Sequence, residues 1–261
     1  MQGIASHKFI PQNQMLNITE GEILLVNKPY RWTSFDVIGS LRGLIKHLIG
    51  KKIKIGHAGT LDPLATGLLI VCTGKSTKRI EEFTAYDKEY TGSFTLGATT
   101  PSYDMEKEVN ETFPTEHITS DMINAAVLSL SGDIMQVPPM FSAIKVDGKR
   151  AYESARKDVD LKLAARPVNI AAFEITRIAL PEVDFRIVCS KGTYIRSLAR
   201  DFGLALLSGA YLSSLCRTRI GPYLLNDAYE VEGLKSVLRE QFEHDKARVI
   251  LNQPHEISLI Q

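Results

Sequence analysis

The chain has no apolar run that approaches the roughly 20 residues needed to cross a membrane. Residues 1–20 also lack the cationic start and the apolar core of a secretory signal; they are polar and contain Pro11. We therefore expect a cytoplasmic protein without membrane association. Residues 1–20 are predicted to form a flexible N-terminal arm.

Cysteine is scarce: Cys72, Cys189 and Cys216 are far apart, and no CxxC pair occurs. This spacing argues against a disulfide framework and against a zinc site. Cys72 and Cys189 lie in apolar runs, which is typical of small core residues. We predict a reduced protein without a bound metal.

The chain also lacks internal repeats, low-complexity tracts and Gly/Ser-rich linkers, and its net charge is only +1 over 261 residues. The charge is unevenly distributed, however. Seven cationic residues and one acid between Lys28 and His57 give that segment a net charge of +6, whereas residues 104–121 have a net charge of −5. The basic segment indicates either a local contact with a polyanion or a solvated lysine face.

Hydrophobic periodicity predicts an alternation of strands and amphipathic helices. Thr33 and Asp36 match a capping box that would begin the first helix. Strands are expected at 23–26, 90–96, 168–170, 185–189 and 215–219, and helices after Thr33, at 119–130, between Gly192 and Gly209, and at 231–242.

One stretch, residues 56–67, concentrates three glycines and a proline around a single carboxylate, Asp62. Glycine permits positive φ and proline fixes φ, so this stretch should be a stiff, irregular loop. Asp62 is either a helix cap in a structural turn or a functional acid held in position. The apolar run 68–72 that follows is predicted to be a buried strand or a short buried helix.

Two further patterns were weighed. Residues 74–77 (GKST) match the end of a phosphate-binding P-loop, but the glycine required five positions earlier is Leu69, so the pattern fails. Asp147-Gly148 indicates a β-hairpin. Cationic and aromatic residues interleave around it, which suits either RNA binding or an ordinary exposed hairpin: Phe141, Lys145, Lys149, Arg150, Tyr152 and Arg156.

Five segments together resemble the TruB-type tRNA pseudouridine-55 synthases: residues 56–67 (GHAGTLDPLATG), 87–90 (DKEY), 138–145 (PPMFSAIK), 190–196 (SKGTYIR) and 215–222 (LCRTRIGP). The resemblance implies isomerisation of uridine 55 in the T loop of tRNA to pseudouridine, without cofactor or metal. It also implies an α+β fold with a long mixed, mostly antiparallel central sheet flanked by helices.

The resemblance implies a catalytic domain over residues 21–230. Many family members also carry a C-terminal RNA-binding domain of the PUA type, but little more than thirty residues follow Tyr229, so we expect only a short C-terminal helix and tail over 231–261. We expect a monomer that recognises mainly the T stem-loop and grips the acceptor arm weakly.

By the same resemblance, Asp62 is the catalytic nucleophile or base, and three roles stay open: attack on the ribose anomeric carbon, addition to the uracil ring, or removal of the ribose 2′ proton. Arg196 would keep Asp62 ionised, and Tyr90 would stack on the flipped base. The remaining implied contacts are Tyr194 and the Leu215 backbone at the uracil edge, His57 near the displaced nucleotide, and Lys28 and Lys191 at phosphates.

Two rival functions were considered. A non-catalytic chaperone of the tRNA elbow would use the basic segment and the hairpin aromatics but would not need Asp62 and Arg196. An aspartyl-nucleophile hydrolase commonly has a second acid two residues after the first, and that position is Leu64.

Overall fold

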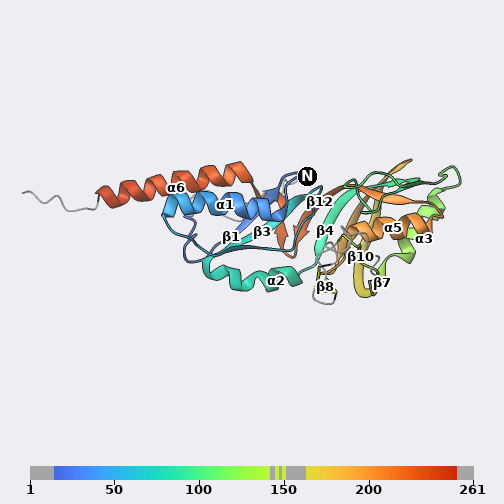
Figure 1. Ribbon diagram of the computed structural model, residues 1–261, viewed down its shortest axis with the longest axis horizontal. Helices are drawn as coiled ribbons and strands as arrows, with labels where there is room; N and C mark the ends of the chain where they lie inside the picture. Colours follow the sequence, from blue (N-terminus) through green and yellow to red (C-terminus); the bar gives the residue numbers. More distant parts are fainter. Residues whose placement is uncertain (1–14, 142–144, 147–148, 151–162, 252–261) are drawn as a thin grey trace, which may run out of the picture.

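The computed structural model describes residues 15–141, 145–146, 149–150 and 163–251. They form one mixed ten-stranded sheet with helices packed against it (Figure 1). The strand order is β14-β1-β3-β12-β4-β11-β10-β7, with β2 paired to β3 and β13 paired to β12. The pairs β1–β14 and β3–β12 are parallel and the others are antiparallel, as the predicted fold class requires.

The strands of this sheet are β1 (Ile23–Lys28), β2 (Ile55–Ala58), β3 (Thr66–Thr73), β4 (Lys88–Leu96), β7 (Gly132–Gln136), β10 (Arg166–Ala179), β11 (Glu182–Cys189), β12 (Ala210–Ile220), β13 (Tyr223–Leu224) and β14 (Tyr229–Glu230). Two short pairs lie outside it, β5 (Ala98–Thr99) with β6 (Glu111–Thr112), and β8 (Lys145–Val146) with β9 (Lys149–Arg150). The antiparallel β8–β9 pair is what the predicted hairpin requires, although Asp147 and Gly148 lie outside the described residues.

The helices are α1 (Ser34–Ile49), α2 (Ile80–Ala85), α3 (Ser120–Ser129), α5 (Ile195–Ala205) and α6 (Val231–Leu251), with short 3₁₀ helices η1 (Gly74–Arg79) and η2 (Leu225–Asp227). The predicted capping box begins α1: the Thr33 side chain accepts from the Asp36 amide, and the Asp36 carboxylate accepts from the Thr33 amide. None of the helices in the described ranges is both long and apolar enough to span a membrane.

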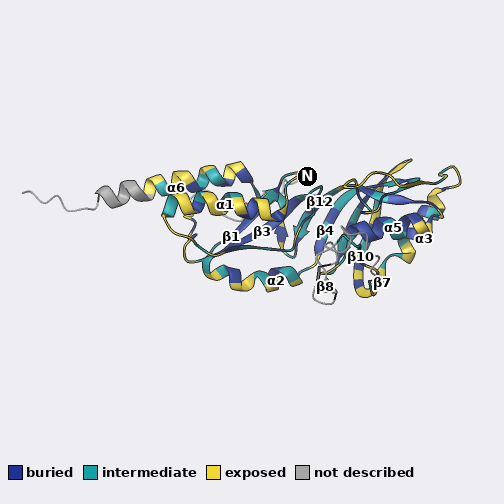
Figure 2. Ribbon diagram, in the orientation of Figure 1, coloured by how far each residue is buried: buried dark blue, intermediate teal, exposed yellow. Residues whose placement is uncertain are grey.

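The ambiguous apolar run 68–72 is the strand β3, and it is apolar throughout because both of its faces are covered (Figure 2). Leu69 and Val71 point to a core shared with α1 and α6. Leu68, Ile70 and Cys72 point the other way, to a core that includes Phe83 of α2. Successive side chains of a strand alternate between faces, so one run of residues serves both cores.

The other half of the sheet is covered on one face by α5 and α3. Its core contains a cluster of aromatic rings from β4, β10, β11 and α5, namely Phe94, Phe173, Phe185 and Phe202. The loop before β3 contributes Leu61 and Ala65 to this same core. The loop that contains Asp62 therefore lies where the two halves meet.

Two predicted boundaries need correction. Leu16 and Ile18 were assigned to a flexible arm, but both are buried in the core beneath α1 and α6. The Gln241 side chain exchanges two hydrogen bonds with the Leu16 backbone, so this end of the arm is fixed to α6. Helix α6 buries Val231, Leu234 and Leu238 in that core and is thus part of the main domain. Residues 1–14 of the predicted arm and 252–261 of the tail lie outside the described residues.

Candidate active site

The Asp62 loop is held by hydrogen bonds on both sides of Asp62. The buried Ser34 hydroxyl, in the first turn of α1, accepts from the Leu61 amide at 2.8 Å and donates to the Leu61 carbonyl at 3.2 Å. The Pro63 carbonyl accepts from the Arg31 amide at 2.8 Å. Within the loop, the Ala65 amide donates to the Asp62 carbonyl. These bonds make the loop as stiff as its composition predicts.

Glycine is required where this loop meets β12. Gly67 has φ +105°, and a Cβ there would lie 2.4 Å from the Arg217 carbonyl oxygen. Gly59, at the other end of the loop, has φ +75°. The backbone thus approaches Arg217 more closely than any side chain would allow.

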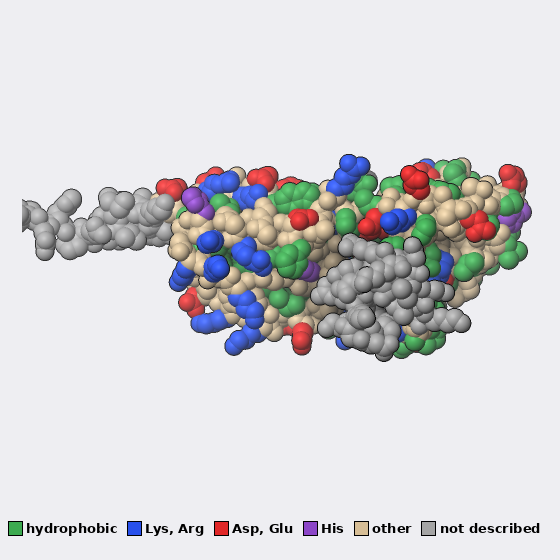
Figure 3. Space-filling model, in the orientation of Figure 1, with side chains coloured by type: hydrophobic (Ala, Val, Ile, Leu, Met, Phe, Trp, Pro, Cys, Tyr) green, Lys and Arg blue, Asp and Glu red, His purple; other side chains and the backbone are tan. Residues whose placement is uncertain are grey.

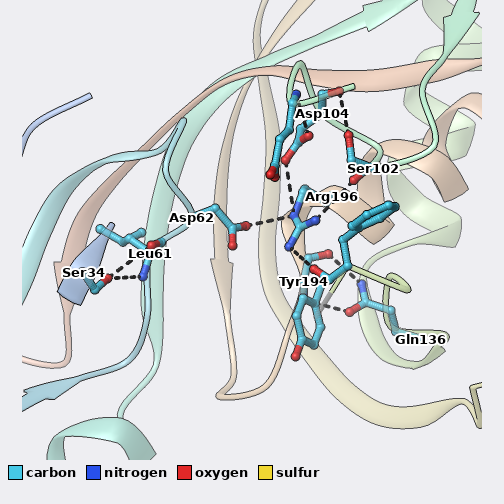
Figure 4. Close-up of polar contacts among 10 residues, drawn as sticks. Ser34, Leu61, Asp62, Ser102, Asp104, Gln136, Tyr194 and Arg196 are labelled. Atoms are coloured by element: carbon cyan, nitrogen blue, oxygen red, sulfur yellow. Dashed lines mark hydrogen bonds and ion pairs between the residues drawn. The ribbon is translucent and has the colours of Figure 1, made fainter. Parts of the chain in front are cut away.

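Arg196 lies in the first turn of α5, and its side chain points toward the Asp62 carboxylate (Figure 4). The N-cap of this helix is Tyr194, whose amide donates to the buried Gln136 side chain and whose carbonyl accepts from it, at 2.8 Å and 3.2 Å. The Ser197 hydroxyl donates to the Val137 carbonyl. The last residue of β7 and the residue after it therefore set where α5 begins, and with it the position of Arg196.

The Arg196 guanidinium lies between two carboxylates. Its Nε is 2.9 Å from Asp62 Oδ2 and 3.6 Å from Asp104 Oδ2. Its other nitrogens donate to the Ser102 and Phe141 carbonyls, at 3.3 Å and 3.0 Å. Arg196 and Asp104 are almost fully buried, with side chains 5% and 6% exposed, whereas the Asp62 side chain is 40% exposed. Of these three charged side chains, Asp62 is the one that is substantially exposed.

Asp62 faces a cavity of about 610 Å³, within the range of small-molecule sites in proteins. Its walls come from the Asp62 loop, from the start of α5, and from β4 and β12. Five of the predicted site residues line it: Asp62, Tyr90, Tyr194, Arg196 and Leu215. The structure therefore brings together residues that are up to 153 positions apart in the sequence, from Asp62 to Leu215.

Three predicted site residues lie elsewhere. Lys191 is exposed, between Ser190 and Gly192, which both line the cavity. His57 is half-buried on β2 and does not line the cavity; its Nδ1 is buried without a hydrogen-bond partner among the described residues, and burial lowers its pKa.

Lys28 requires a correction, because its side chain is fully buried and cannot meet a phosphate in this conformation. Its Nζ donates to the carbonyls of Pro29, Trp32 and Pro63, at 3.0, 2.5 and 3.4 Å. Through Pro63 it helps to hold the Asp62 loop. Its position in the basic segment predicts an exposed lysine, but Lys28 is buried whereas Lys51, Lys52 and Lys54 of that segment are exposed.

The structure adds residues that the sequence had not indicated as functional. Arg217 is buried and donates from Nε to the Leu68 carbonyl at 2.8 Å and from Nη2 to the Gly59 carbonyl at 3.0 Å, so it joins both ends of the Asp62 loop. Lys88 is buried beside it and also lines the cavity. Lys88 and Arg217 lie in two of the motifs shared with the family, 87–90 and 215–222. The pairing of β12 with β4 shows that they flank Tyr90. Asp104, Gln136 and Ser34 also support the site, but no sequence pattern indicated a functional role for them.

Burial sets the protonation behaviour of the cavity wall. It raises the pKa of the Tyr90 phenol, an effect that the nearby Arg217 charge opposes. It lowers the pKa of Lys88 to about 8, and repulsion from Arg217 adds to this. The described residues include no group of three or more His, Cys, Asp or Glu side chains arranged to hold a metal ion. The titratable side chains that line the cavity are the carboxylates of Asp62 and Glu106, the phenols of Tyr90 and Tyr194, and four cations: Lys88, Lys107, Arg196 and Arg217.

Comparison with known proteins gives consistent matches. Residues 46–195 match the family model described as TruB family pseudouridylate synthase (N terminal domain). The chain is 55% identical over 227 residues to the tRNA pseudouridine synthase B of Phocaeicola vulgatus, covering 87% of this chain and 97% of that protein. It is 56% identical over 214 residues to that of Flavobacterium johnsoniae, covering 81% and 93%.

Among solved structures, a chain of a Cbf5-Nop10-Gar1 complex matches with a TM-score of 0.65 and 28% identity, covering 88% of this chain and 57% of that chain. A chain of an H/ACA RNP bound to a substrate RNA containing 2′-deoxyuridine matches with a TM-score of 0.62 and 26% identity, covering 88% and 56%. The chain thus spans little more than half the length of these two structural relatives.

Proposed function

Since the chain belongs to the TruB family of pseudouridylate synthases, we propose that it isomerises uridine 55 in the T loop of tRNA to pseudouridine, with Asp62 as the catalytic carboxylate. The observation that carries the role of Asp62 is its ion pair with Arg196 at the mouth of the 610 Å³ cavity. The Arg196 guanidinium, 2.9 Å away, places a positive charge beside this carboxylate and fixes the side of the cavity to which it is turned.

The target nucleotide must leave the RNA stack to reach Asp62, because the bond to be cut is inaccessible within it. The flipped uracil would enter the cavity against Tyr90, with its edge at Leu215 and Tyr194. The ribose would remain at the mouth, beside Asp62. Lys191, exposed at the rim, is placed to meet a phosphate, a contact that positions RNA without reading its sequence.

The reaction breaks the bond between ribose C1′ and uracil N1 and forms a bond between C1′ and uracil C5. The proton lost from C5 is balanced by a proton gained at N1, so neither an oxidant nor a reductant is needed. Asp62 would act by attack on C1′, by addition to the uracil ring, or by removal of the 2′ proton. We propose that the enzyme acts as a monomer.

The test uses a T stem-loop transcript with tritium at uridine C5, because bond formation at that carbon expels the tritium. We expect release with the wild-type chain and none above background with Asp62→Asn, which retains the shape of the side chain. Asp62→Asn should still bind the transcript. If folded wild-type protein releases no tritium, the isomerase assignment is wrong. If Asp62→Asn retains full function in folding tRNA, the chaperone of the tRNA elbow is favoured instead.

A further inference from the structure

Three cationic side chains around the Asp62 loop are buried without a carboxylate partner. Lys28, Lys88 and Arg217 are 0%, 6% and 1% exposed. The ion pairs formed among the described residues include none of them. Among the described residues these side chains donate to backbone carbonyls, those of Lys88 to Thr84 and Tyr86, and Arg217 also has a side-chain hydrogen bond with Tyr90. Buried charge without a counter-ion is unfavourable, so its retention calls for an explanation.

Two of these three cations, Lys88 and Arg217, line the cavity, whereas Lys28 does not. Arg217 on β12 lies opposite Tyr90 on β4. Lys88 precedes Tyr90 by two residues on the same strand, so both side chains are on one face of the sheet. The two cations therefore flank the ring against which the uracil is proposed to lie.

The proposed reaction creates an anion at this place. When the C1′–N1 bond breaks, its electron pair leaves with uracil, and the negative charge spreads over N1, O2 and O4. On the ribose side, Asp62 either forms a bond to C1′, which breaks again when C5 attacks that carbon, or takes the 2′ proton and returns it to C2′ as C5 bonds to C1′. The ring then turns, C5 supplies the electron pair of the new bond to C1′, and the C5 proton is lost as N1 gains one. After the first bond has broken and before the second has formed, the uracil is an anion held in the cavity.

We propose that Lys88 and Arg217 form an anion subsite on the cavity floor that holds the uracil while it carries this negative charge. The inference rests on the proposed function, and it assigns to two residues a contact with the detached base. Fixed charges aimed at developing charge need no reorganisation during the reaction, which is why such groups accelerate it. Before cleavage the base is neutral, so the subsite favours the intermediate over the bound substrate.

The titration of Lys88 agrees with this role. With its pKa near 8, Lys88 is largely protonated at pH 7 and becomes neutral as the pH rises further. The subsite therefore loses charge above about pH 8. Arginine retains its charge well beyond that pH.

The test compares Lys88→Met with wild type in single-turnover reactions on T stem-loops that contain either uridine or 5-fluorouridine at the target position. Fluorine withdraws electrons, so the fluorinated ring carries negative charge with less help from the protein. We expect Lys88→Met to slow conversion of uridine by about 100-fold, the size of effect seen when one such charge-stabilising donor is removed. The conversion of 5-fluorouridine, followed by loss of the starting nucleoside, should slow by about tenfold or less.

Lys28→Met is the matched control, because Lys28 is an equally buried lysine with the same lowered pKa, to about 8, but lies outside the cavity. Whatever its effect on rate, it should slow both substrates by the same factor. Lys88→Arg should restore most of the rate and extend it above pH 8, where the wild-type rate declines.

Equal slowing of both substrates by Lys88→Met, or no slowing, would overturn the subsite while leaving the proposed function intact. A wild-type chain that converts no uridine would instead refute the proposed function itself. A melting temperature for each variant shows that the protein assayed is folded.

Discussion

At the scale of single residues, the site depends on one guanidinium that serves four oxygen atoms. Arg196 approaches Asp62 and Asp104 and donates to the carbonyls of Ser102 and Phe141. Its Nε is at ion-pair distance from Asp62 without hydrogen-bond alignment, so Asp62 is paired electrostatically yet free to turn toward a substrate. A planar, permanently charged group suits this task better than a point charge on a flexible stem.

The first prediction concerns this residue. Arg196→Lys should lower the single-turnover rate by about 100-fold, because a single ammonium cannot reach both carboxylates and both carbonyls at once. Affinity for the T stem-loop should change by less than about threefold, since a surface phosphate contact is not removed. Rapid-quench kinetics and filter binding measure the two quantities. A variant that loses affinity and retains its rate would show that Arg196 binds RNA rather than serving Asp62.

At the scale of elements, the position of Asp62 is decided where β3 begins. Gly67 pairs with Lys28 of β1 on one side and with Arg217 of β12 on the other. Asp62 lies five residues before it, after Ser34 has fixed Leu61. The residues from Leu61 to Gly67 therefore contact α1, β1 and β12. Because these contacts lie close to Asp62 in the chain, they fix the position of its carboxylate.

Replacing Gly67 with alanine should consequently be costly. The added Cβ would meet the Arg217 backbone at 2.4 Å, and φ of +105° strains any residue with a side chain. We expect a loss of more than about 2 kcal/mol in the free energy of unfolding. Gly43→Ala is the control, since Gly43 lies in α1 with nothing within 4 Å of its Cβ. It should stabilise the chain by about 0.5–1 kcal/mol. Urea titration of both variants measures the two free energies of unfolding. Equal values would mean that the backbone of β3 and β12 can shift at Gly67 and Arg217 at little cost.

At the scale of the whole molecule, the cavity lies between two halves of one sheet, and basic side chains gather at one end of it. Figure 3 shows lysine and arginine side chains clustered at the end of the molecule that contains α1 and α2. The segment 51–54 and η1 are joined there, because the Gly74 amide donates to the Lys54 carbonyl. Lys51, Lys52 and Lys54 are exposed. The strand β2 leads from these lysines to the Asp62 loop, roughly 16 Å away at about 3.3 Å per residue.

This basic end should bind RNA backbone near the cavity. Converting Lys51, Lys52 and Lys54 to glutamine should weaken T stem-loop binding and reduce the slope of log Kd against log salt by about 2 to 3, if each lysine neutralises one phosphate. The rate at saturating RNA should not change, because none of the three lines the cavity. Arg166→Gln, at the exposed first residue of β10, is the control and should leave the slope unaltered. A triple variant with an unaltered slope would assign these lysines to a solvated face.

The sequence by itself determined the local features of this protein and the motifs that carry its chemistry. The capping box of α1, the stiff loop around Asp62 and the alternation of β4 follow from neighbouring residues, so their physical causes can be read along the chain. The resemblance also indicated that Asp62 and Arg196 meet, and the structure places them 2.9 Å apart.

The tertiary structure alone decided what happens to residues whose partners lie far away in sequence. The local sequence around Lys28 predicts a surface cation. In the structure the side chain is fully buried and donates to three backbone carbonyls. Arg217 looked like a strand residue, and only the approach of β3 and β4 to β12 gives it Gly59, Leu68 and Tyr90 as neighbours. Burial and charge pairing depend on contacts between distant segments, and no local pattern encodes them.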